Sequence, residues 1–363
     1  MEYEIMSEPP EVTFTKRIPQ PSVLTVQCVA PAEKKRSILG KLLKSSFVML
    51  FVLSVLINVY IFAIIAGMSA SPMSTTVLSD GDNESVIAVY TVGGTITPQT
   101  ASEFGVFYRQ VRDDKNIKAV VIHVDSPGGY ITPSDQISRM VGEMREKLNR
   151  TVIVSMGSCA ASGGYYISVP AERIFAEPTA IVGSIGVIGM YPNVKGLTEK
   201  IGIEVIVIRA TKCTRFKAKP DPFSSPENET RISLQKMLDE YHEMFIDVVT
   251  ATRPGIVSKS EEVTVPDATG KDVTFTETSP FNGQIFLAKE AKARNLIDEI
   301  GGLDVAINWL VKNKNLDGEK VVHYSKSPTL VESMGFQSSG IMIDNELVQQ
   351  SLSPRIMMLW KVD

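Results

Sequence analysis

The feature that most constrains this chain is an uncharged apolar run from Ser46 to Met68. No charged residue occurs between Lys44 and Asp80. At about 1.5 Å per residue, a helix over this run would extend roughly 34 Å, enough to cross a hydrocarbon core of about 30 Å. Buried helices of soluble proteins are rarely uncharged over such a length, so we expect a transmembrane helix over residues 46–68.

The charges that flank this run predict its orientation. Basic residues cluster before it, whereas Ser69 to Ser79 carry no charge. The positive-inside rule therefore predicts a single-pass protein of the cell (inner) membrane, with residues 1–45 as a flexible cytoplasmic tail and the rest periplasmic or extracellular. A cleavable signal peptide is the alternative, but its apolar region is normally about 7–15 residues long. The longer, later run favours an uncleaved signal-anchor.

Composition excludes several classes of function. The formal net charge is -4, so no basic field indicates a nucleic-acid partner. The three cysteines have no metal-ligand spacing, and their odd number makes a disulfide framework improbable. We therefore expect no metal and no cofactor. Hydrophobic residues make up 44% of the chain, which is enough for a full core.

After a polar linker over residues 69–85, the chain alternates between two patterns. Short β-branched runs predict buried strands that begin at Val86, Ile117, Thr151, Arg173 and Glu204. Helical segments are expected over 133–147, 192–202, 225–253, 284–294 and 305–313, with Ser225 as N-cap and Pro226 as first helical residue of the third. This alternation predicts an α/β domain over 86–315, with a mostly parallel sheet covered by helices. Residues 316–363 form an irregular C-terminal extension that ends in an apolar patch.

Three small-residue turns follow predicted strands and are candidates for chemistry. HVDSPGGY, from His123, has paired glycines whose N–H groups suit an oxyanion, although Pro-Gly-Gly is also a common turn. SMGSCAASGGYYIS, from Ser155, is a strand-turn-helix sequence of the kind that presents a nucleophilic serine, or else close helix–sheet packing. AIVGSIGVIG, from Ala180, is a loop that could line the same cleft.

A serine nucleophile needs a base, and histidine is poorly placed to supply it. His123 lies in a predicted strand, and no other histidine follows until His242. A lysine is the more plausible base, and Lys212, Lys217 and Lys219 cluster in one segment. Lys217, between Phe216 and Ala218, has the most apolar neighbours. The alternative for each is an ordinary solvated lysine.

In this order the motifs resemble those of the SppA family of signal peptide peptidases, which have a crotonase/ClpP-like fold. The resemblance covers roughly residues 86–311 and includes DSPGG, GSCAASGGYYIS, GSIGVIG, FKAKPDPF and GQIFLAKEAKARNLIDEIGGLDVAI. It implies the following roles: nucleophile Ser162, general base Lys217, oxyanion donors Gly129 and Gly163, and lysine-orienting Ser184. Thr214 and Arg215 stand where the family often has a glycine before the lysine.

The resemblance also implies a function. It predicts a serine endopeptidase with a Ser–Lys dyad that hydrolyses remnant signal peptides or other hydrophobic or unfolded segments at the membrane. It further implies a ring-shaped homo-oligomer, in which the dyad can be completed between neighbouring subunits, and no cofactor.

Three other functions were weighed. A crotonase-type acyl-CoA enzyme would be soluble and would need no serine nucleophile. A ClpP-like Ser-His-Asp protease would need a histidine soon after Ser162. A degenerate membrane scaffold would have lost its base, and would be indifferent to mutation of Lys217.

Overall fold

The computed structural model describes residues 38–68, 73–225, 228–266, 271–316, 318–326 and 355–359. The chain divides into one unit over Met1–Ile64 and another over Ile65–Asp363. Helix α1 (Ile38–Met68) contains a stretch, Lys44–Phe62, with mean hydropathy 2.2 and no buried residue. By length and composition, α1 could cross a membrane.

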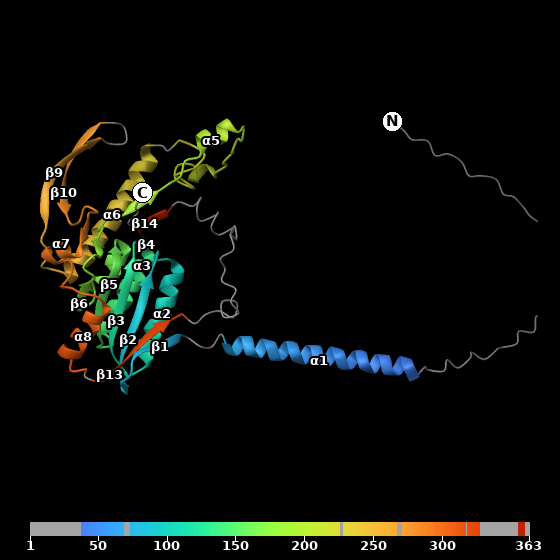
Figure 1. The fold of residues 1–363 in the computed structure, drawn as a ribbon. Helices are drawn as coiled ribbons and strands as arrows, with labels where there is room; N and C mark the ends of the chain where they lie inside the picture. Colours follow the sequence, from blue (N-terminus) through green and yellow to red (C-terminus); the bar gives the residue numbers. More distant parts are fainter. Residues whose placement is uncertain are drawn as a thin grey trace, which may run out of the picture. The chain divides into compact units, whose positions relative to one another are not determined.

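The second unit is built on a nine-stranded sheet (Figure 1). Its main path runs β1-β13-β2-β3-β5-β6-β12, and β7 joins β5 to β11. All neighbours pair in parallel except β1 with β13 and β11 with β7. The strands are β1 (Ser74–Ser79), β2 (Asp82–Gly93), β3 (Ile117–Ser126), β5 (Thr151–Ala161), β6 (Arg173–Ala176), β7 (Ile181–Gly183), β11 (Ile285–Leu287), β12 (Glu299–Ile300) and β13 (Glu319–Ser325). The expected α/β fold with a mostly parallel sheet is confirmed.

Helices cover both faces of this sheet. Alternate residues of β2 point to opposite faces, so Ala88 and Tyr90 pack in one apolar cluster and Ile87 and Val89 in another. The first cluster is covered by α2 (Pro98–Asp113), α3 (Ile131–Glu146), α4 (Gly163–Ser168) and α6 (Asn228–Thr252), and the second by α8 (Leu303–Asn313). Because both faces are buried, the middle parts of the central strands are mostly apolar.

Two smaller sheets and three short helical segments complete the described fold. A hairpin is formed by β9 (Lys259–Pro266) and β10 (Asp272–Ser279). A three-stranded sheet has the order β4 (Gly128–Tyr130), β14 (Arg355–Leu359), β8 (Ile188–Met190), and β14 is antiparallel to both neighbours. The remaining segments are α5 (Lys195–Lys200), a 3₁₀ turn at Thr211–Cys213 and α7 (Ala288–Ala293).

Most predicted strands and helices are observed, with the following differences. The strand expected from Glu204 is wrong, because this segment is irregular and much of it is exposed. The helix expected over 284–294 begins only at Ala288, since residues 285–287 pair with β7. The helix expected from Pro226 is observed from Asn228, and Pro226 lies outside the described residues.

Two predicted irregular segments contain strands. The expected linker over 69–85 includes β1, which pairs with β13, and the beginning of β2. The C-terminal extension contains β13 and β14. The domain boundaries themselves stay a prediction.

Candidate active site

Ser162 lies at the junction between β5 and α4 in a strained conformation. Its φ is 52° and its ψ is -116°, a combination that side-chain-bearing residues rarely adopt and that costs about 1–3 kcal/mol. Its N–H donates to Gly183 O at 2.7 Å, and its carbonyl accepts from Tyr166 N at 2.9 Å. A serine held on a sharp strand-to-helix turn is the arrangement that presents a nucleophile.

The two predicted oxyanion glycines lie against each other. Gly129 is the central residue of β4, and a Cβ added at Gly163 would lie 3.1 Å from Gly129 N and 2.6 Å from Ser134 Oγ. Ser126 fixes the preceding turn, because its hydroxyl donates to Gly94 O at 2.6 Å and accepts from Gly128 N at 3.1 Å. Only glycine permits this approach of β4 to the first turn of α4.

Ser184 lies beside Ser162 because β7 pairs with the end of β5. Ala161 is the partner of Gly183, and Ser184 N–H donates to Gln284 O at 2.8 Å. Ser184 is buried and has a φ of 51°. The hydroxyl of Ser162 donates to Gly186 O at 3.5 Å, a long hydrogen bond. Ser162, Gly163, Gly129 and Ser184 therefore come together in one site.

Lys217 is not brought to Ser162. Its backbone is held, since its N–H donates to Cys213 O at 3.1 Å and its carbonyl accepts from Arg209 Nε at 2.6 Å. An ion pair of Arg209 with Asp221, at 3.1 Å, fixes the same segment. The side chain of Lys217 is exposed, and within the described part of the chain it makes no hydrogen bond or ion pair.

Sequence reasoning missed a histidine that lines a cavity next to the site. The cavity, of about 580 Å³, is bounded by Ser184, Gly186 and Ile188, by α6 and by β10. His242 of α6 lines it, and the Nε2 atom of this residue is buried without a partner among the described residues. Its position in the middle of a helix gave no sign of this role, since the cavity depends on where α6 packs.

Other titratable groups near the site are held in their neutral forms. Burial raises the pKa of Cys159 to about 11. Burial also raises the pKa of Tyr165 and of Tyr166, whose hydroxyls donate to Leu296 O at 2.9 Å and to Asp135 Oδ1 at 3.3 Å. None of these groups is a base near neutral pH.

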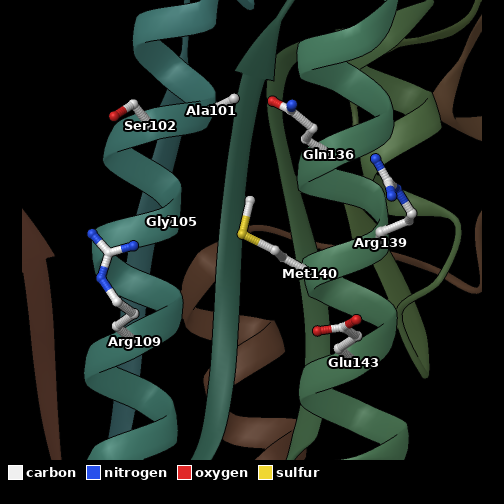
Figure 2. A pocket seen from close by; sticks show the side chains of 8 residues that line it. All are labelled: Ala101, Ser102, Gly105, Arg109, Gln136, Arg139, Met140 and Glu143. Carbon is white, nitrogen blue, oxygen red and sulfur yellow. The ribbon is translucent and has the colours of Figure 1, made fainter.

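A separate hollow of about 380 Å³ lies between α2 and α3 (Figure 2). Two of its charged side chains are engaged locally: Arg139 pairs with Asp135 at 2.9 Å, and Glu143 accepts from Tyr108 at 2.8 Å and from Lys147 at 2.8 Å. It includes none of the predicted site residues, so it is not the candidate active site.

Comparison with known proteins finds a matching family and several similar proteases. Residues 145–317 match the profile of Peptidase family S49. Putative protease MJ0651 from Methanocaldococcus jannaschii is 30% identical over 238 residues, which cover 65% of this chain and 70% of that protein. Protease 4 from Haemophilus influenzae is 31% identical over 230 residues, or 61% of this chain and 34% of that protein. Putative signal peptide peptidase SppA from Enterococcus faecium is 29% identical over 231 residues, which cover 64% of this chain and 60% of that protein.

A mostly parallel sheet covered by helices, with a serine on a strained strand-to-helix turn, fits the class of α/β proteins with a ClpP/crotonase-like fold. More particularly, the chain belongs to peptidase family S49, and the proteins similar to it include Protease 4 and a putative signal peptide peptidase SppA. It spans about a third of the length of the Haemophilus relative, 34%, and more of the other two. The matched segment, 145–317, contains Ser162, Gly163, Ser184 and Lys217.

Proposed function

We propose that this protein is a membrane-anchored serine endopeptidase that binds substrates as extended strands beside Ser162. One observation carries the proposal: β14 already lies as a strand between β4 and β8. In this register Met358 is opposite Gly129, the predicted oxyanion donor, and Met357 is opposite Ile188. A peptide added between two strand edges is bound mainly through its backbone, which suits an enzyme that acts on varied segments.

The chemistry proposed for the site uses Ser162 and a lysine. Neutral Lys217 takes the proton from Ser162 Oγ as this atom attacks the peptide carbonyl carbon. The N–H groups of Gly129 and Gly163 hold the oxyanion, and the ammonium of Lys217 protonates the leaving amine. Water then hydrolyses the acyl-enzyme, and Ser184 orients the lysine amine. The substrates proposed are remnant signal peptides and other hydrophobic or unfolded segments, which α1 would place near the enzyme.

We propose further that Lys217 acts on Ser162 of a neighbouring copy within a homo-oligomeric ring. The segment that holds the lysine exposes many large apolar side chains, among them Leu197, Ile201, Ile203, Ile206, Ile208 and Phe216. Ile206 is 75% exposed and Ile208 90% exposed. A contiguous sequence of such side chains is typical of a surface that a partner covers.

Orientation in the membrane is part of the proposal. The basic residues before α1 would keep residues 1–45 in the cytoplasm and place the peptidase domain on the other side.

Peptide hydrolysis by the full chain in detergent micelles tests the catalytic groups. We expect Ser162→Ala and Lys217→Ala to lose at least about 10⁴-fold in kcat, and Lys212→Ala to stay active. His242→Asn belongs in the same series, because His242 is the histidine of the adjacent cavity. If His242→Asn loses activity and Lys217→Ala does not, the general base is His242 and not Lys217. If the wild-type protein forms a folded oligomer but hydrolyses no peptide, the alternative function, a catalytically degenerate membrane scaffold, is favoured.

Co-expression tests whether the dyad forms between copies. A mixed ring of Ser162→Ala and Lys217→Ala copies would contain about a quarter of sites with an intact serine and an intact neighbouring lysine. We expect about that fraction of wild-type activity. If each dyad forms within one copy, the mixture stays inactive.

A further inference from the structure

The cavity beside Ser184 is acidic. Among the described residues, it is lined by three carboxylates, Asp239 and Glu243 on α6 and Glu277 on β10, and by no lysine or arginine. Much of the remaining wall of the cavity is apolar and consists of Val187, Ile188, Ile246, Phe275 and Phe281. We call it the acidic cavity.

Within the described ranges, the carboxylates of the acidic cavity have no cationic partner. Asp239 accepts a hydrogen bond from Gln235 at 2.7 Å, and Glu277 accepts one from Asn282 at 3.2 Å. Among the described residues, none of the three carboxylates makes an ion pair, and His242 Nε2 is buried there without a partner. Like charges that share a partly enclosed space favour a bound cation.

The strand register points a bound peptide at this cavity. Ile188 lines the cavity, and it is directly opposite position 357 of β14. Residues directly opposite in an antiparallel pair have side chains on the same face. In a peptide that replaces β14, the residue opposite Ile188 therefore faces the acidic cavity, one residue before the position opposite Gly129.

The adjacent position meets a different environment. Gly189, opposite position 356, lines a second cavity of about 420 Å³. In the part of the chain that the structure describes, that cavity contains Arg231, apolar side chains such as Leu234 and Leu238, and no carboxylate. It also contains Thr230, which is buried with its hydroxyl unpartnered among the described residues. A basic side chain is therefore unfavourable at the peptide position opposite Gly189, one residue before the position opposite Ile188.

We infer that the acidic cavity is a specificity site that selects lysine or arginine at the substrate position opposite Ile188. The aliphatic stem packs along Ile188 and Phe275, and the charged end lies among the three carboxylates. This inference rests on the proposed peptidase function and names the substrate class of that site.

The proposed general base, whose amine is expected at Ser184, differs from a substrate lysine whose charged end lies among the carboxylates. Carboxylates favour the charged form of an amine and so raise its pKa, whereas a general base must be neutral near the working pH. The three carboxylates therefore suit a cation that stays charged, which is what a substrate side chain provides.

Two peptides of identical composition test the inference. Both are fluorogenic and are based on residues 355–359: Arg-Ile-Lys-Met-Leu places lysine opposite Ile188, and Arg-Lys-Ile-Met-Leu places it opposite Gly189. The ratio of their kcat/KM values for the full chain in micelles cancels competition from β14, because both peptides meet the same competitor. We expect the first peptide to be preferred by about tenfold.

Substitutions of the cavity carboxylates test whether the cavity causes the difference in kcat/KM between the two peptides. Glu243→Gln should lower the preference by about threefold, and Glu243→Gln with Glu277→Gln by about tenfold, as expected for partly solvated ion pairs. Glu240→Gln is the matched control, because Glu240 is on the same helix but does not line the cavity. The control should keep the full ratio.

The outcomes separate this inference from the function on which it rests. Equal hydrolysis of the two peptides, or a preference that survives the double substitution, would overturn the basic specificity and leave the peptidase standing. If neither peptide is hydrolysed, the proposed function fails. Fluorescence anisotropy with labelled copies of the same peptides then tests the acidic cavity by binding alone. The specificity for a basic side chain would be refuted if the two peptides bound with equal affinity to wild type and to the double variant.

Discussion

Substitution of Gly129 by alanine should damage both the fold and the activity. A Cβ at this position would lie 2.1 Å from Ile96 O, 2.6 Å from Ile96 N and 2.7 Å from Ile96 C. Ordinary van der Waals contact begins near 3.4 Å. Because these are backbone atoms of a fully buried residue, β4 and the Ile96 segment would have to separate by more than about 1 Å.

The hydrogen bonds around Gly129 set the magnitude. Ile96 N–H donates to Gly128 O at 2.9 Å, and Tyr130 N–H donates to Ile96 O at 2.9 Å. Both would be lost on such a separation, at about 1 kcal/mol each, with further cost for the displaced buried backbone. We expect a total of about 2–4 kcal/mol, which lowers Tm by about 4–12 °C for a domain of this size.

Activity should fall further than stability alone requires. Gly129 N–H is a proposed oxyanion donor, and the loss of one such donor costs about 10²–10³-fold in kcat. Thermal unfolding of the full chain in micelles gives Tm, and peptide hydrolysis well below that temperature gives kcat.

Gly142→Ala is the matched control. Gly142 lies inside α3, and its added Cβ would meet nothing closer than Pro170 Cβ at 3.9 Å. Alanine is favoured over glycine in a helix by about 1 kcal/mol, so this variant should be slightly stabilised and fully active. If Gly129→Ala melts and hydrolyses peptide like Gly142→Ala, the close approach of β4 to Ile96 and the oxyanion role of Gly129 are both refuted.

Three further predictions concern other parts of the second unit. Removal of residues 354–363 should raise kcat/KM several-fold for peptides, because β14 competes for the strand site; unchanged kcat/KM would mean that β14 does not occupy the site in solution. Asp298→Ala should cost about 3 kcal/mol in the free energy of unfolding, since it leaves the largely buried side chain of Arg253 without its carboxylate partner at 2.8 and 3.0 Å. Glu290→Ala, at a more exposed pair, should cost under about 1 kcal/mol. Cys159, with a pKa of about 11, should be only about 0.1% thiolate at pH 8, so iodoacetamide should label it far more slowly in the folded chain than in urea, as read by mass spectrometry.

The sequence predicted the centre of the sheet well because burial on both faces leaves a simple signal. The runs at Val86, Ile117 and Thr151 are mostly apolar, and the buried apolar residues of each alternate between two covered faces. Ser162 and the paired glycines were predictable for a related reason. Small residues at a strand end are required by the local backbone, and the strained φ of Ser162 and the contacts of Gly129 and Gly163 show that requirement.

Other features depend on contacts between distant segments, and a local pattern does not contain them. Residues 285–287 pair with β7, which replaced the start of a predicted helix by a strand. His242 reached the cavity only through the packing of α6, and β14 reached β4 across most of the chain.

One physical arrangement, a second copy of the chain, would account for two findings: the strand predicted from Glu204 is not formed, and Lys217 does not contact Ser162. The run from Glu204 predicted a buried strand, yet within one chain Ile206 and Ile208 are largely exposed. The same irregular segment leads to Lys217, whose amine has no contact with Ser162 in the described part of the chain. A second copy placed against this segment would bury the apolar side chains and bring in the lysine at once. The proposed ring would account both for an apolar run that stays irregular and for a proposed base that makes no contact with Ser162 among the described residues, and the mixed-ring experiment tests whether the dyad forms between copies.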